Sequence, residues 1–337
     1  MKNLLVLLFL LMAPVCHAQG NETAVPFLLI VPDARSAGMG DTGIASSYDV
    51  FSNYHNAAKN VFTENKNELG IFYVPWMNSI VKDVFLSGGS YVHRISERSV
   101  YGFGLNYFTL GNLDLTDDNG ASLGTERPSD LSIDFNYGLM LGPRFSMGVG
   151  LKYIRSDLGL NSSDSDITTI NTGAIDVSSF YQSLPVRYGS KEVIYRAGVV
   201  VKNFGPNVET SEGGNTQPLP TTIGAGFGTE LFFNPRNSLT LNLEYEQLIR
   251  TEQGGSYDHT YSFGFEYGFD ETFFLRSGYF DEIDPEGSRQ YLTFGTGFVS
   301  NSVAFDLSYL FNQSQLNNAL DNTLRMSLTF AFGGNKS

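Results

Sequence analysis

An acid and a base stand two residues apart near the start of the chain, in a segment that also carries proline and glycine. The residues concerned are Pro32, Asp33, Arg35, Gly38, Met39, Gly40 and Asp41. Glycine permits positive φ and a close approach of the backbone to a neighbour, and an unpaired charge is costly to bury. We therefore expect this element to form ion pairs that hold its segment against another part of the protein, which is the chemistry of a structural latch.

Catalytic chemistry has little support elsewhere in the sequence. Beyond the first twenty residues the histidines are His55, His93 and His259, and no Gly-x-Ser-x-Gly elbow or recognisable Ser-His-Asp arrangement accompanies them. The acidic run from Asp114 to Gly120 lacks the spacing of a calcium loop. We predict that the protein is not an enzyme and has no metal site and no cofactor.

The first residues are typical of a secretory signal peptide. An apolar run from Leu4 to Met12 leads to a small-residue ending, so we predict a signal peptide over 1–18 that is cleaved between Ala18 and Gln19. The run is shorter than the roughly 20 apolar residues of a membrane-spanning helix. Cleavage also removes Cys16, the only cysteine, so the mature chain has no disulfide, thiol nucleophile or thiolate metal site.

Composition indicates a β-protein in a membrane. The 337 residues include 27 Phe, 18 Tyr and 36 Gly, 17% are charged, and the net charge is −14. A mean hydropathy of −0.11 argues against disorder, and the negative charge argues against a nucleic-acid binder, which needs a basic face. Few charges, many aromatics and much glycine at near-neutral hydropathy are typical of a transmembrane β-barrel.

Period-two alternation recurs from about residue 66 to residue 332. Large apolar side chains alternate with small or polar ones over 131–141, and the pattern returns over 239–246, 261–269 and 303–311. Tyr and Phe often stand at the ends of the apolar rows, as in the aromatic girdles at the two membrane interfaces. A soluble β-sandwich, which would pack the apolar rows into a core, is the alternative.

We predict fourteen strands that close into one antiparallel transmembrane barrel over residues 66–332. Their ranges are 66–75, 82–93, 98–110, 130–142, 144–157, 173–183, 193–203, 219–233, 237–250, 256–269, 271–282, 289–299, 301–311 and 322–332. Tight connections alternate with longer polar ones, as in bacterial barrels with short periplasmic turns and long external loops. Both termini are then periplasmic, the link over 184–192 is unusually long for its side, and residues 333–337 form a C-terminal tail.

Residues 19–65 do not alternate and precede the first strand, so they are not part of the wall. They carry several prolines and glycines together with the apolar run from Phe27 to Val31. Such a segment hides its apolar surface best inside the lumen, so we predict a plug; a periplasmic tail is the alternative. In the plug, Arg35 would pair with inward carboxylates of the wall. The candidates are Asp134, Glu244, Glu246 and Glu266.

The sequence from Phe27 to Ala45, with its Pro-Asp-Ala-Arg and Gly-Met-Gly elements, closely resembles the PorV family. These are outer-membrane barrels of the type IX secretion system of Bacteroidetes, related in fold to FadL-type channels. The resemblance continues over His55–Lys59, where Ala57 replaces the proline that relatives usually have, and over Tyr73–Trp76. The sister protein PorQ and other FadL-like barrels have a related Arg-x-x-Gly-Met-Gly segment, so this segment alone does not distinguish PorV from them. The resemblance implies a FadL-like barrel of fourteen strands with a short N-terminal helix and plug.

The resemblance also implies a function at the cell outer membrane. Members of the family associate with the large translocon barrel, collect cargo that carries a C-terminal secretion domain, and pass it to a surface sortase complex that attaches it to lipopolysaccharide. The expected partners are therefore the translocon barrel, cargo secretion domains, the surface attachment complex, and outer-membrane lipid with lipopolysaccharide. Loops are freest to bind partners, so we expect cargo contacts in the external loops 111–129, 157–172 and 204–218.

Three alternatives stay open at the level of sequence. Some members of the family carry a name that implies lipid A or O-deacylase activity, so the resemblance leaves an outer-membrane esterase as the enzymatic alternative. The same barrel suits a FadL-like outer-membrane channel for hydrophobic small molecules, in which the plug moves and the ligand leaves through a lateral gap in the wall. Within the plug, Arg35 could contact cargo or a lipid head group instead of a wall carboxylate.

Overall fold

The computed structural model describes residues 23–76, 83–116, 120–158, 168–211, 214, 216–249, 259–283, 289–312 and 323–333. The predicted signal peptide, its cleavage site between Ala18 and Gln19, and most of the predicted C-terminal tail lie outside these residues. Before the first strand come η1 (Pro26–Leu29), α2 (Ala34–Gly38), α3 (Ser52–His55) and η2 (Ala57–Phe62). None of the helices in this part of the chain is long and apolar enough to cross a bilayer.

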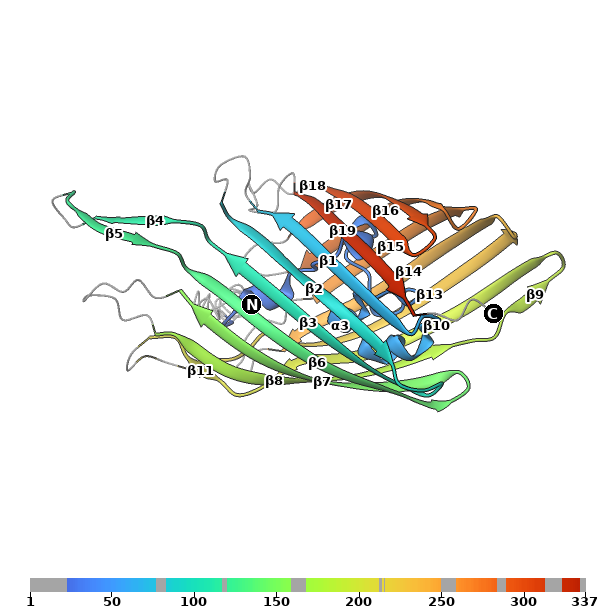
Figure 1. Ribbon diagram of the computed structural model, residues 1–337, viewed down its shortest axis with the longest axis horizontal. Helices are drawn as coiled ribbons and strands as arrows, with labels where there is room; N and C mark the ends of the chain where they lie inside the picture. Colours follow the sequence, from blue (N-terminus) through green and yellow to red (C-terminus); the bar gives the residue numbers. More distant parts are fainter. Residues whose placement is uncertain are drawn as a thin grey trace, which may run out of the picture.

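Fourteen strands of the described residues form a closed wall (Figure 1). They are β1 (Asn67–Pro75), β2 (Phe85–Arg94), β3 (Ser99–Thr109), β6 (Ser129–Gly142), β7 (Phe145–Asp157), β8 (Ile170–Gln182), β10 (Lys191–Phe204), β13 (Thr221–Asn234), β14 (Asn237–Ile249), β15 (His259–Phe269), β16 (Phe273–Ile283), β17 (Gln290–Ser300), β18 (Val303–Asn312) and β19 (Leu324–Phe332). Every pair is antiparallel, and β19 pairs with β1 while β10 pairs with β13, which closes the ring. The predicted barrel is confirmed.

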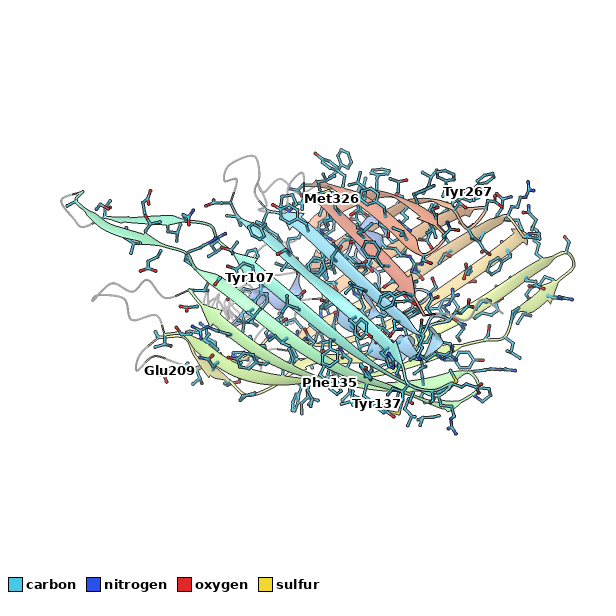
Figure 2. All side chains as sticks on the ribbon, viewed as in Figure 1. Tyr107, Phe135, Tyr137, Glu209, Tyr267 and Met326 are labelled. Carbon is cyan, nitrogen blue, oxygen red and sulfur yellow. The ribbon has the colours of Figure 1, made fainter. Side chains whose placement is uncertain are left out.

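Burial along the wall is inverted relative to a soluble protein. On β6, Ser132 and Asp134 are 0% and 3% exposed, whereas Ile133 and Phe135 are 43% and 41% exposed. Polar side chains face the interior and apolar ones face outward, where Phe135 and Tyr137 lie on the outer surface (Figure 2). A β-sandwich would bury the apolar row between two sheets. The sandwich alternative is therefore wrong, and the pattern is that of a barrel in lipid.

The two ends of the barrel differ. Short turns join the strands at the right of Figure 1, and at the left longer stretches of sequence separate consecutive wall strands. Short ribbons that were not predicted extend both ends. They are β4 (Leu113–Thr116) with β5 (Ser122–Glu126) and β11 (Val208–Glu209) with β12 (Thr216–Gln217) at the long-loop end, and β9 (Val186–Tyr188), paired with β10, at the other. Strands of two to five residues are too short to show alternation.

The segment before β1 lies inside the ring. α2 packs against β16, β17, β18 and β19, and η2 packs against β3, β6, β7 and β8. Glycines of the wall make room for it: a Cβ on Gly278 of β16 would lie 2.0 Å from the backbone nitrogen of Gly40. The inner face of the wall and the backbone of the plug are therefore in direct contact, and the plug fills the middle of the lumen.

Candidate functional site

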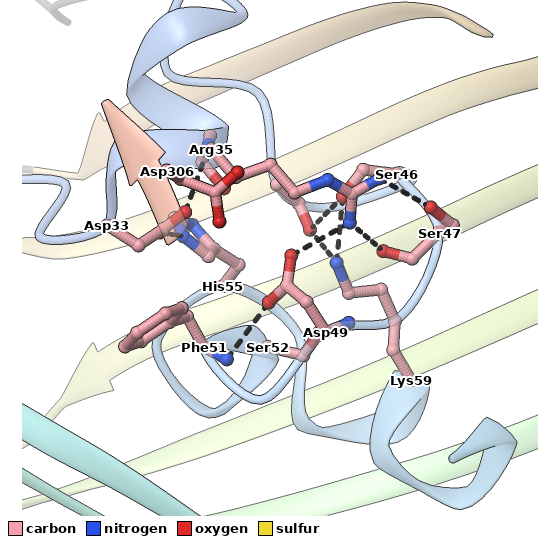
Figure 3. A network of polar contacts seen from close by, with 12 residues as sticks. Asp33, Arg35, Ser46, Ser47, Asp49, Phe51, Ser52, His55, Lys59 and Asp306 are labelled. Atoms are coloured by element: carbon pink, nitrogen blue, oxygen red, sulfur yellow. Dashed lines mark hydrogen bonds and ion pairs between the residues drawn. The ribbon is translucent and has the colours of Figure 1, made fainter. Parts of the chain in front are cut away.

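Asp33 ties the first part of the plug together. Its Oδ2 accepts the backbone N–H of Ser36 at 2.8 Å, which caps α2, and its Oδ1 lies 2.6 Å from Nε2 of His55 on α3 (Figure 3). Burial alone favours the neutral acid, but the charge and hydrogen bond of His55, with the Ser36 contacts, hold the pKa of Asp33 below its ordinary value. The charged carboxylate therefore joins α2 to α3.

Arg35 lies where the plug meets the wall. Its Nε and Nη2 donate to the two carboxylate oxygens of Glu266 on β15 at 3.1 and 3.0 Å, and its Nη1 donates to Asp49 at 2.9 Å. Nη2 also donates to the Ser47 hydroxyl at 2.6 Å (Figure 3). Burial opposes the charge, but Glu266 and Asp49 outweigh it and raise the pKa of Arg35. Arg35 thus connects α2, the loop before α3 and the wall.

Glu266 belongs to a row of charges that crosses the inner wall. Arg276 on β16 donates from Nε to Glu266 and from Nη1 to Asp306 on β18, each at 2.6 Å. All three residues are at least nine-tenths buried. The two arginines on Glu266 offset the cost of burying its charge, because buried ions are tolerated only when they are paired and hydrogen-bonded. The contact made by Arg35 is therefore anchored across three wall strands.

The backbone at Gly40 and Asp41 forms a second point of attachment. Both residues have positive φ, +70° and +64°, and a Cβ on Gly40 would lie 2.7 Å from the carbonyl oxygen of Phe263. At position 40 a side chain would meet the wall backbone as well as this conformation, so only glycine fits there. The Asp41 carboxylate accepts hydrogen bonds from Nη1 of Arg325 on β19 at 2.7 Å and from the Tyr291 hydroxyl on β17.

The other predicted residues of this element make uncharged contacts. Gly38 lies against Gly295 of β17, where a Cβ would be 3.1 Å from its Cα. Met39 is fully buried, and its sulfur accepts from Nδ2 of Asn242 at 3.8 Å. Pro32 lines a cavity described below. These residues fill space between the two charged attachments.

Of the four wall carboxylates predicted as partners of Arg35, the structure places Glu266 on it and the other three elsewhere. Glu244 accepts two backbone N–H groups of the plug, each at 2.9 Å. Glu246 pairs at 3.1 Å with Lys202 of β10, which lies on the far side of β13, and Asp134 pairs at 3.5 Å with Lys152 of the neighbouring strand β7. Glu244 therefore binds the backbone of the plug, whereas Glu246 and Asp134 form ion pairs between strands of the wall.

Sequence reasoning missed Asp49, Arg276 and Lys59. The Nζ of Lys59 donates to the Gly43 carbonyl at 2.6 Å and to Ser46 Oγ at 2.9 Å. Burial lowers the pKa of Lys59 to about 8, although nearby acids such as Asp49 act in the opposite direction. Arg276 stands at an inward position of an alternating strand, a signal that could have identified it, whereas Asp49 and Lys59 lie where the sequence has no periodicity.

On the opposite side of the plug, hydrogen bonds without ion pairs join the described plug residues to β2–β8. Nδ2 of Asn53 donates to Ser90 Oγ on β2 at 2.8 Å, and Ser146 Oγ on β7 donates to the Ala58 carbonyl at 2.6 Å. The recorded ion pairs between plug and wall therefore lie on β15 and β19. Amides, hydroxyls and the Arg94 guanidinium, which donates to the Thr63 carbonyl at 3.1 Å, hold the side of β2 to β8.

The histidines lie in three separate places. His55 contacts Asp33, His93 contacts Asn67 at 2.7 Å, and His259 contacts the Tyr245 hydroxyl at 2.5 Å. In the part of the chain that the structure describes, no group of three or more His, Cys, Asp or Glu side chains is arranged to hold a metal ion. Residues 117–119 of the acidic run 114–120 lie outside that part.

A cavity of about 530 Å³ lies between the plug and the long-loop end of the lumen. Large apolar side chains that line it include Phe27, Leu29, Trp76, Phe108, Leu248 and Phe280. Beside it the pairing of β10 with β8 shifts register between Val201 and Phe204, and Asn203 has a φ of +57°. The backbone N–H of Asn203 donates to the Asp176 carboxylate instead of to a strand partner. Charged side chains such as Lys152, Lys202 and Glu246 also line the cavity. The cavity is therefore amphipathic, and it adjoins an irregular part of the wall.

The chain shares its fold with FadL-type outer-membrane barrels. The toluene transporter TbuX of Ralstonia pickettii aligns with a TM-score of 0.53 at 12% identity, over 89% of this chain and 98% of that one. The toluene transporter TodX of Pseudomonas putida gives 0.51 at 14%, over 89% and 98%. CymD, a monoaromatic hydrocarbon channel, gives 0.50 at 15%, over 90% and 98%. The closed wall and the plug in its lumen therefore define a barrel with the FadL-like fold.

A sequence comparison identifies one family within this fold. Residues 17–253 match the model of the type IX secretion system protein PorV. The chain belongs to the PorV family, and the predicted outer-membrane localisation is confirmed. No curated protein matches the sequence significantly.

Proposed function

We propose that this chain is the outer-membrane component of the type IX secretion system that binds cargo carrying C-terminal secretion domains and carries it from the translocon barrel to the surface attachment complex. The match of residues 17–253 to the PorV family carries the proposal. The latched plug supports it, because a barrel whose lumen is filled from Asp33 to Phe62 is suited to binding proteins at its surface. In this proposal the protein acts by binding and has no catalytic step.

The long-loop end offers a surface for cargo. The ribbon of β4 and β5 continues β3 and β6 past the wall and projects at the upper left of Figure 1. Leu113 is exposed on it, beside the acidic Asp114. Exposed loops on a rigid scaffold are common binding sites, and this ribbon falls within the predicted cargo loop 111–129.

Deletion of the gene in its native host tests the proposal. We expect proteins with C-terminal secretion domains to accumulate in the periplasm with these domains uncleaved. Complementation with a chain in which a short turn replaces residues 112–127 should leave the barrel folded and in the membrane but reduce cargo export. Normal export in the deletion strain would refute the proposed function, and normal export with the shortened ribbon would refute only the role of that surface.

A FadL-like channel for hydrophobic small molecules is the second candidate, and the amphipathic cavity beside the irregular β10 favours it. Ligand pockets are commonly apolar clefts of a few hundred Å³ with a few polar groups. In the deletion strain, this function predicts reduced uptake of hydrophobic compounds with normal cargo export. Unchanged uptake of a panel of alkyl and aromatic compounds would remove it.

A further inference from the structure

The first ten described residues, Thr23–Pro32, are held differently from the rest of the plug; we call them the strap. From Asp33 onward the plug makes many polar contacts with the wall, as described above. For the strap, the described residues record one hydrogen bond to the barrel, from the Ala24 N–H to the Pro218 carbonyl at 2.9 Å. Its other recorded backbone bonds, Leu28 to Val25 and Ile30 to Phe27, are internal. Packing therefore dominates its attachment.

The backbone of the strap is also strained. Val25 has φ 52° and ψ 52°, the left-handed region, and its side chain is 3% exposed. A β-branched residue is sterically disfavoured there, because its Cβ crowds the following carbonyl. A conformation of this kind persists only where surrounding contacts impose it. Packing in the lumen therefore holds the strap in a backbone conformation that is locally unfavourable.

The strap packs into the main apolar cluster of the lumen, which also includes side chains of β1, β2 and β3. Ala24, Val25 and Phe27 are buried in one cluster with inward side chains of β7 and β8 and of the segment before β13. These wall residues are Ile154, Ile170, Ala174 and Leu219. They are apolar where most inward positions of the wall are polar, as on β6. We call the apolar surface formed by these wall residues the groove; an uncharged peptide such as the strap matches it. The strap also lines the amphipathic cavity described above, beside charged side chains such as Lys152 and Glu246.

We propose that the strap is an intramolecular ligand in a peptide-binding groove, and that an extended apolar peptide of a partner protein displaces it from the long-loop end. The ligand has the chemistry of the strap itself: a large apolar side chain in the place of Phe27, small apolar ones before it, and no charge over about five residues. The plug from Asp33 onward stays latched during the exchange. This inference does not depend on the role in secretion.

Hydrogen exchange on the purified protein in detergent tests whether the strap opens by itself. The amides of Phe27–Val31 are expected to exchange at least tenfold faster than those of Ala37–Asn60. Cysteines at Ala24 and Pro218, whose backbones are hydrogen-bonded, would form a disulfide in a mature chain predicted to have no other cysteine. Oxidation should remove the fast exchange and reduction should restore it. Equal protection of strap and plug would overturn the proposal.

Peptide binding tests the groove. A labelled peptide of residues 23–31 is expected to bind a variant lacking those residues, and to bind the intact or oxidised protein at least tenfold more weakly, because a tethered ligand competes at high effective concentration. The same peptide with Phe27→Ala should bind this variant at least about tenfold more weakly than the unmodified peptide does. If the variant lacking the strap keeps its β-barrel circular dichroism and heat-modifiable mobility but does not bind the peptide, the groove is not a peptide site.

The reduced double-cysteine protein covers the case in which the variant lacking the strap does not fold. Its chain is complete, so any peptide binding must displace the strap. Binding that appears on reduction and disappears on oxidation supports the proposal. Absence of binding in both states, with fast strap exchange in the reduced one, would overturn the assignment of a peptide ligand.

Discussion

Arg35 joins three parts of the molecule that are distant in sequence: α2, Asp49 before α3, and Glu266 on β15. Replacing it with alanine leaves Asp49 without its ion pair and Glu266 with one arginine instead of two. We expect the Arg35→Ala variant to lose about 2–4 kcal/mol of unfolding free energy, since breaking a buried pair leaves an uncompensated charge. Urea titration in detergent measures this loss.

Arg155 offers a matched control for that measurement. Its pair with Asp157 is about half exposed at the long-loop end of β7, and exposed pairs contribute little. The Arg155→Ala variant should therefore unfold almost as the parent does. An Arg35→Ala variant that is no less stable than Arg155→Ala would show that Arg35 is not a latch.

Lys59 makes stability depend on pH in the alkaline range. Its pKa of about 8 in the folded protein lies below the ordinary 10.5, so the unfolded chain binds more protons between these values. Stability therefore rises with pH from about 8 to 10.5 through this group. The Lys59→Met variant lacks this contribution. We expect the stability of the parent relative to the variant to increase over that window, and a constant difference would contradict it.

Some contacts of Arg35 can be predicted from the sequence alone, and others cannot. The need of Arg35 for a carboxylate follows from its charge, and the inward positions of alternating strands supplied Glu266 as a candidate. Asp49 and Lys59 lie in the plug, where the chain has no repeating pattern, and the contacts that bury them depend on the closed barrel. Their roles became visible only in three dimensions.

Glycines of the wall strands decide how closely an element of the plug can approach. A Cβ on Gly278 would lie 2.0 Å from the nitrogen of Gly40 and 2.2 Å from the carbonyl carbon of Met39, both backbone atoms. The Gly278→Ala variant must push the plug away from β16 and should lose about 3 kcal/mol. Gly142→Ala, at a site with no atom within 4 Å, should change stability by less than about 0.5 kcal/mol. Similar melting temperatures for the two variants would contradict this packing.

Strands of the wall were easier to predict than the short ribbons. A wall strand such as β6 has fourteen residues, enough to show alternation between lipid and lumen. β4 and β5 have four and five residues and face water on both sides, so no difference in environment imposes a pattern on them. The same reasoning explains why the long link over 184–192 was not recognised as containing β9.

The whole molecule is a closed ring around a plug that is ion-paired to the wall, and this arrangement predicts its electrical behaviour. In planar lipid bilayers the intact protein should show no steady single-channel conductance, because the plug spans the lumen from β2 to β19. A variant lacking residues 34–61 should give discrete conductance steps if it folds. Steady conductance of the intact protein at a level typical of open barrels would mean that the plug does not seal the lumen.

The pairing of β1 with β19 also has a consequence for biogenesis. The plug precedes β1 in the chain, yet it ends inside a ring whose seam joins the first wall strand to the last. Once the seam has closed, the plug can enter only through an open end. The sheet should therefore close around a plug that is already in place.

Cysteines at Tyr73 and Met326, which face each other across the seam, would report closure in vivo. The Gly278→Ala variant should then close its seam more slowly than Gly142→Ala, and equal rates would show that wall and plug assemble independently.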